Sequence, residues 1–146
     1  MQDSIISWGE LSYYGLSLLS FLRENHPLLA EDTDFITQRA DSAAQVYSEA
    51  IQSGHNHIEA EEAASEELYR GLRFSAFNTL VNILWDEFSG EVSEDEARSV
   101  ALRLYPLCVN VLERYSLSDD FDMTPQYGML YTELVGSLQI LLENGF

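Results

Sequence analysis

Lysine is absent from this chain of 146 residues, so all seven of its Lys and Arg positions are arginine. Without lysine, chemistry that needs a side-chain amine, such as a Schiff base, is excluded. The single cysteine, Cys108, excludes an intramolecular disulfide. No Gly-rich phosphate loop, nucleophile elbow or Cys–His pair at a catalytic spacing occurs. The sequence therefore contains no recognisable reaction centre and favours a protein that is not an enzyme.

Long hydrophobic runs are also missing. No stretch approaches the roughly 20 apolar residues of a membrane-spanning helix. The N-terminal residues contain neither a basic side chain nor a long apolar run, so no signal peptide is predicted. Together with the lone cysteine, which suits a reducing compartment, these absences lead us to expect a cytoplasmic location.

Metal-binding patterns are incomplete. His55 and His57 lie near Glu59 and Glu61, but a zinc site needs three or four ligands and no further histidine or cysteine is placed by the sequence. The acidic residues 119–122 lack the ligand spacing of a calcium loop. We therefore expect no metal and no cofactor.

Acidic side chains are abundant. The chain has 25 Asp and Glu residues and a formal net charge of −18. Such a charge repels nucleic-acid phosphates and anionic lipids, so we expect no direct binding to nucleic acid and none to a membrane. Basic proteins are the natural electrostatic partners.

Hydrophobic residues recur at helical spacing along almost the whole chain. The pattern predicts an all-α, single-domain bundle of about six helices over residues 10–146, preceded by a flexible segment at residues 1–9. Pro106 falls within the fifth helical pattern and predicts a kink or a break there. The expected helices cover residues 10–25, 33–53, 57–71, 75–89, 93–115 and 124–145.

Three acidic stretches are the candidate interaction surface. Residues 59–67 hold five acids in nine positions, or roughly one charge per 2.7 Å of helix axis, against about one per 1.7 Å in duplex DNA. A solvated helix face is the more ordinary explanation of such a run, and Glu66 is spaced to pair with Arg70. The candidate acids are Glu59, Glu62, Glu66, Asp86, Glu87, Glu91, Asp119, Asp120 and Asp122.

Three aromatic residues lie off the expected core stripes: Trp8, Tyr13 and Phe121. Exposed aromatic side chains often anchor protein–protein interfaces, so we examine these positions as well. The apolar face of the first helix is wide, and a second copy of the chain is one candidate to cover it.

Several segments resemble a family of small acidic proteins encoded on conjugative transposons and mobile regions of Bacteroidetes. They are Leu11–Leu19, Leu68–Leu72, Leu104–Cys108, Leu117–Phe121 and Leu130–Leu134. The family has no assigned function or site residues. The resemblance implies a bacterial cytoplasm and a context of DNA transfer and DNA processing.

Three hypotheses follow. The first is a non-enzymatic interaction module of a mobile genetic element, which binds a basic or nucleic-acid-processing protein through an acidic helical surface. The second is an acidic mimic of DNA that occupies a basic DNA-binding groove. The third is a small enzyme or ligand-binding helical bundle, which would require a concave pocket with convergent polar groups.

Overall fold

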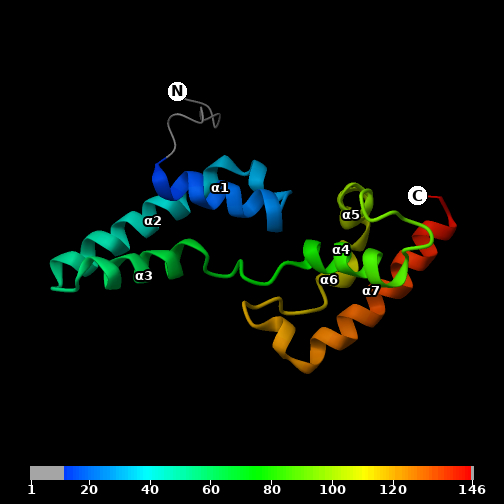
Figure 1. Ribbon diagram of the computed structural model, residues 1–146. Coiled ribbons are helices and arrows are strands. Elements are labelled where there is room, and N and C mark those ends of the chain that lie inside the picture. Colours follow the sequence, from blue (N-terminus) through cyan, green and yellow to red (C-terminus); the bar gives the residue numbers. More distant parts are fainter. Residues whose placement is uncertain (1–11, 146) are drawn as a thin grey trace. The chain divides into compact units, whose positions relative to one another are not determined.

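The computed structural model describes residues 12–145, and this part of the chain contains helices and no strand (Figure 1). The predicted all-α fold class is confirmed. None of the helices in this range is both long and apolar enough to cross a membrane. The expected segment at residues 1–9 lies outside the described residues.

The described chain divides into two compact units between Arg70 and Gly71. The expectation that residues 10–146 form one domain stays a prediction.

The first unit consists of three α-helices and a short 3-10 helix. Ser12 caps the first of them, since its hydroxyl accepts the Gly15 N–H at 3.1 Å. Asp32 caps the second through the Phe35 N–H at 3.0 Å. The elements are α1 (Tyr13–Asn25), η2 (Leu29–Glu31), α2 (Thr33–Gln52) and α3 (His57–Leu68).

Helices α2 and α3 form a closely packed hairpin (Figure 1). Their contact uses small side chains, because Ala40, Ala43, Ala60 and Ala64 are all buried. Arg39 of α2 caps the C-terminal end of α3. Its Nη1 donates to the backbone carbonyl oxygens of Glu67, Leu68 and Arg70, at 3.3, 3.2 and 2.7 Å. A cation at this position stabilises the negative end of the helix.

The second unit contains four α-helices and two 3-10 helices. The predicted interruption at Pro106 is confirmed: α5 ends at Leu104, and a 3-10 turn separates it from α6. Proline has no N–H to continue the helix, and its ring clashes with the carbonyl four residues earlier. The elements are α4 (Ala76–Glu87), α5 (Ala97–Leu104), η3 (Tyr105–Cys108), α6 (Val109–Leu112), η4 (Phe121–Met123) and α7 (Pro125–Glu143).

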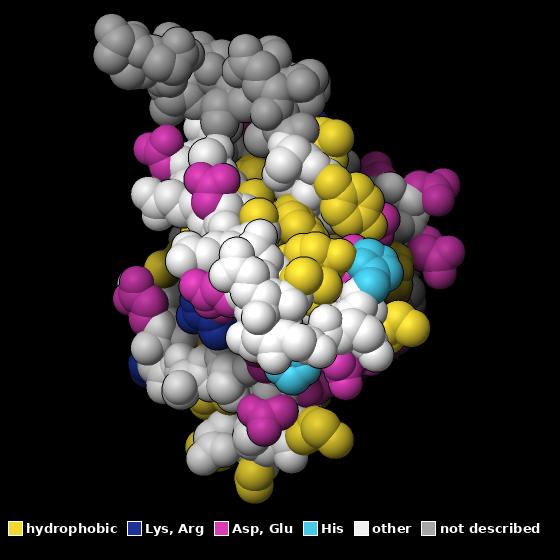
Figure 2. Space-filling view, turned by 90° about the vertical axis from the view of Figure 1, so that its left-hand side faces the viewer, with side chains coloured by type: hydrophobic (Ala, Val, Ile, Leu, Met, Phe, Trp, Pro, Cys, Tyr) yellow, Lys and Arg dark blue, Asp and Glu magenta, His cyan; other side chains and the backbone are white. Residues whose placement is uncertain are grey.

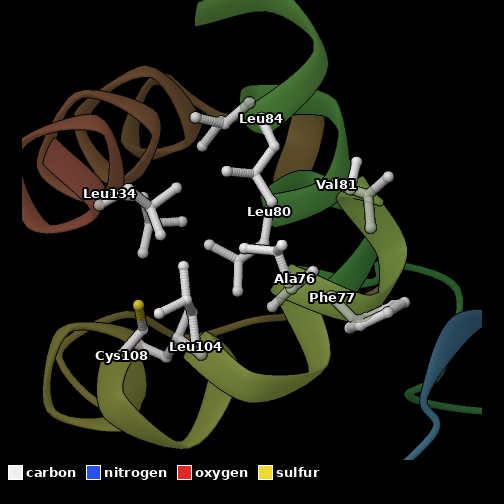
Figure 3. Close-up of a cluster of buried hydrophobic side chains, with 14 of the residues drawn as sticks. Ala76, Phe77, Leu80, Val81, Leu84, Leu104, Cys108 and Leu134 are labelled. Carbon is white, nitrogen blue, oxygen red and sulfur yellow. The ribbon is translucent and has the colours of Figure 1, made fainter. Parts of the chain in front are cut away.

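The hydrophobic core of this unit lies between α4, α5 and α7 (Figure 3). Leu80 and Leu84 of α4 point toward Leu104 of α5 and Leu134 of α7, and all four are fully buried. Cys108 is buried beside them, as expected for a small hydrophobic residue. Burial raises the pKa of its thiol.

Phe121 belongs to the core and not to the surface. Only 3% of it is exposed, and its ring packs against those of Phe74, Tyr115 and Tyr127. The sequence pattern did not indicate this burial, because Phe121 stands among acidic residues. The 3-10 helix η4 directs its side chain into the core from an otherwise polar loop. Phe121 is therefore not a candidate for an interface.

Candidate functional site

The second unit has a concave surface, a groove with a volume of about 800 Å³. We call it the acidic groove. The end of α4, the loop that follows it, α5 and the last turns of α7 form its walls. Its lining residues are Glu87, Phe88, Glu91, Val92, Glu96, Ser99, Val100, Arg103, Gln139, Leu142 and Glu143.

Burial separates this lining into an apolar floor and a polar rim. Phe88, Val92 and Val100 are at most 6% exposed, and they form the floor with the half-buried Leu142. The glutamates and the other polar lining residues are exposed and form the rim. Four glutamates face one arginine, Arg103, in this rim as the described residues define it. The groove is therefore apolar at its base and negative at its mouth.

The loop between α4 and α5 is held in place by local contacts. The Trp85 indole N–H donates to the Glu94 carbonyl at 3.3 Å, and Val92 is buried in the core. The Ser93 hydroxyl bonds the Glu96 carboxylate at 3.0 Å and accepts the Glu96 N–H at 3.3 Å. These contacts hold the loop that carries Glu91 and Glu96 in place before any ligand arrives.

The same contacts delay the start of the helix. Residues 93–96 form a turn, and α5 begins at Ala97 and not at Ser93 as the sequence pattern predicts. The sequence Ser93–Glu96 has the Ser-x-x-Glu pattern of a capping box at a helix start, but the Glu96 side chain binds the Ser93 hydroxyl instead of a backbone N–H, so the box is incomplete.

Glu87 of the rim contacts a side chain of α7. Its Oε2 accepts a hydrogen bond from the Tyr131 hydroxyl at 3.2 Å. Burial, together with the charge of Glu87, raises the pKa of Tyr131 to about 12. Tyr131 thus stays a neutral donor and orients the carboxylate. Asp86 is exposed on α4 and is not part of the groove lining.

The predicted acids of α3 are exposed on the first unit. Glu59 completes a capping box: its carboxylate accepts the Asn56 N–H at 3.0 Å, while the Asn56 side chain accepts the Glu59 N–H at 2.8 Å. The backbone hydrogen bond lowers the pKa of Glu59. Glu62 and Glu66 have no ion-pair partner among residues 12–145.

The expected pair between Glu66 and Arg70 does not form. Arg70 binds Glu67 instead, with Nη2 and Oε2 3.1 Å apart. The reason is that α3 ends at Leu68, so Arg70 is no longer one helical turn from Glu66.

The acidic loop before α7 has a structural task in the second unit. The Asp119 carboxylate accepts the backbone N–H groups of Gly71 and Arg73, at 3.1 and 3.0 Å. Asp120 accepts the Ser118 hydroxyl at 2.9 Å. Asp122 is exposed. Asp119 thus connects two distant parts of the unit, and its charge is directed at the backbone.

The aromatic candidates differ in position. Tyr13 is 74% exposed at the start of α1, and its ring meets Tyr14 edge-on. Trp8 lies outside the described residues.

On the face drawn in Figure 2, acidic side chains are scattered among hydrophobic and uncharged ones and form no continuous row.

The histidines of the first unit contact neighbouring side chains. His57 Nδ1 lies 2.6 Å from the Tyr47 hydroxyl, and His55 Nδ1 lies 3.4 Å from Glu59. Within residues 12–145, no three His, Cys, Asp or Glu side chains are grouped so that they could hold a metal ion.

Sequence reasoning found two rim residues, Glu87 and Glu91, and missed the five others that join them: Glu96, Ser99, Arg103, Gln139 and Glu143. Gln139 and Glu143 are one turn apart on α7, and the amide donates to the carboxylate at 3.4 Å. Their polar positions between the apolar residues of the last helix were the only available signal. Tertiary packing brings them beside α4 and α5.

Fold and surface together define a small, acidic, all-helical protein with a charged groove. The chain belongs to the family described as a domain of unknown function, DUF1896, whose model matches residues 7–145. It is also similar to protein PG0816 from Porphyromonas gingivalis, known by crystal structure, with a TM-score of 0.87 and 40% sequence identity. That match covers 94% of this chain and 93% of the other. None of the curated proteins matches the chain.

Proposed function

We propose that this protein is a non-enzymatic interaction module of a mobile genetic element, which binds a basic protein of the DNA-transfer or DNA-processing machinery. The acidic groove carries the proposal, because it offers an apolar floor and fixed negative charges in one place. The mobile-element context rests on the resemblance of the sequence segments named above.

The distribution of ion pairs among the described residues supports a surface that can bind a cationic partner. Arg70, Arg73 and Arg114 pair with Glu67, Asp119 and Glu133 within their own units. The carboxylates of Glu67, Asp119 and Glu133 therefore already have a cationic partner within the chain. Glu91 and Glu143 of the groove have no cation partner among residues 12–145. A basic partner would gain both attraction and faster association from such charges.

Affinity capture tests the proposal. The tagged protein is exposed to lysate of a cell that carries its native element, at low and at high salt, and the bound proteins are identified by mass spectrometry. We expect a specific partner that survives high salt, since burial of apolar surface is not screened. The proposal would be contradicted if the protein captured no partner at either salt concentration. It would also be contradicted if the protein turned over a substrate and a single substitution that preserves the fold abolished this activity.

A mimic of DNA is the second candidate, and the exposed glutamates of α3 favour it. Glu59, Glu62 and Glu66 lie at spacings of three and four residues, so they follow one face of that helix. A mimic predicts binding that competes with DNA and weakens steeply with salt. Changing these three residues to glutamine should then reduce capture, whereas the interaction-module proposal predicts no loss.

A further inference from the structure

The chemistry of the acidic groove specifies what it can hold. Three walls contribute carboxylates: Glu87 ends α4, Glu91 and Glu96 lie in or at the end of the following loop, and Glu143 ends α7, whereas α5 contributes Arg103. The floor between them is apolar. The groove therefore favours a ligand that carries positive charges beside an apolar group.

The acidic groove is too small for a whole folded domain to enter it. A volume of about 800 Å³ lies within the range of pockets that take ligands or short peptide segments, roughly 300–1,000 Å³. It accommodates a few side chains of an extended or helical segment. The fixed loop between α4 and α5 means that little ordering is needed on this side when a segment binds.

We infer that the acidic groove is a docking site for a short basic segment of a partner protein, in which one apolar side chain is flanked by arginine or lysine residues. The apolar side chain contacts the floor formed by Phe88, Val92, Val100 and Leu142. The cations lie beside Glu87, Glu91 and Glu143 at the rim. This inference rests on the proposed function and adds the place and the chemistry of the contact.

A synthetic peptide tests the docking site without knowledge of the natural partner. The probe is the acetylated, amidated peptide Arg-Arg-Gly-Leu-Gly-Arg-Arg, titrated into the full chain by calorimetry at about 0.15 M salt, where exposed charges act over about 8 Å. The triple variant Glu87→Gln, Glu91→Gln, Glu143→Gln should weaken binding about tenfold, because three rim ion pairs are lost. Glutamine keeps an acceptor for the Tyr131 hydroxyl, and circular dichroism checks the fold.

A matched variant removes the same charge elsewhere. Glu62→Gln, Glu66→Gln and Asp122→Asn together should change the affinity less than about twofold, because these residues are not in the groove. Equal weakening by both triple variants, or no binding at about 1 mM peptide, would overturn the docking site. Replacing the leucine of the peptide by serine should also weaken binding, and an unchanged affinity would refute the role of the floor.

The outcome separates this inference from the proposed function. If the lysate partner binds the wild-type chain and the groove variant equally well, the interaction module stands and the groove is not its docking site. If capture depends on the groove glutamates and the peptide binds there, both are supported.

Discussion

Asp119 provides the sharpest test of how the second unit is held together. Its carboxylate accepts two backbone N–H groups from the segment that leads into α4, and Phe121 of the aromatic cluster follows it two residues later. Replacing Asp119 by alanine removes both hydrogen bonds at once. The loop before α7 then loses its link to residues 71–73.

The expected cost follows from the geometry. A hydrogen bond to a charged group contributes roughly 1.5–3 kcal/mol, but the Asp119 side chain is 34% exposed, so water replaces part of the loss. The ion pair with Arg73, at 4.0 Å, adds little because both groups are partly exposed. We expect Asp119→Ala to lower the free energy of unfolding by about 2 kcal/mol. With a urea m-value of roughly 2 kcal/mol/M, the midpoint falls by about 1 M.

Urea unfolding followed by circular dichroism measures this shift. Asp120→Ala is the control, because it removes a neighbouring charge whose carboxylate accepts a hydrogen bond from the Ser118 hydroxyl within the same loop. It should change the free energy of unfolding by no more than about 0.5 kcal/mol. Equal midpoints for Asp119→Ala and the wild type would refute the structural role of Asp119.

Other features make further predictions. Asn56→Ala should cost about 1 kcal/mol in urea unfolding, because it removes the cap of α3. The lowered pKa of Glu59 means that its stabilising bond is present at neutral pH and is lost in acid, so the stability curves of wild type and Glu59→Gln should converge as the pH falls below the ordinary range of a glutamate. The Cys108 thiol should react with a thiol reagent only as the protein unfolds, and prompt labelling of the native chain would contradict its burial. Glu87→Gln should lower the Tyr131 pKa from about 12 toward 10, measured by NMR of labelled tyrosine. Since the neutral phenol is favoured in the folded state, its contribution to stability is present below pH 10 and is lost between about pH 10 and 12.

Most of the helical architecture could be predicted from local signals. Periodic apolar residues and good caps place α2 and α3 to within a few residues, and Pro106 marks the break between α5 and α6. The errors arise where a tertiary contact overrides a local pattern. Burial of Val92 turns the chain just before α5, so the helix starts four residues later than the capping pattern indicates.

Only part of the acidic groove could be predicted from the sequence. Glu87 and Glu91 stand in an acidic stretch, whereas Glu143 is more than fifty positions away and becomes their neighbour only through the packing of α7 on α4. Asp119 shows the opposite case, because its acidic context indicates a solvated loop and its actual partners are two distant N–H groups. Neither relation leaves a local pattern that a single sequence can reveal.

Hydrogen-exchange mapping of the complex with the captured partner is the most direct test of the acidic groove as the docking site. We expect slower amide exchange in residues 87–103 and 139–143 when the partner binds, with the rest of the described chain little changed. We also expect this protection to disappear in the Glu87→Gln, Glu91→Gln, Glu143→Gln variant. Protection confined to residues 57–66 of α3 would contradict docking in the groove and favour the mimic of DNA.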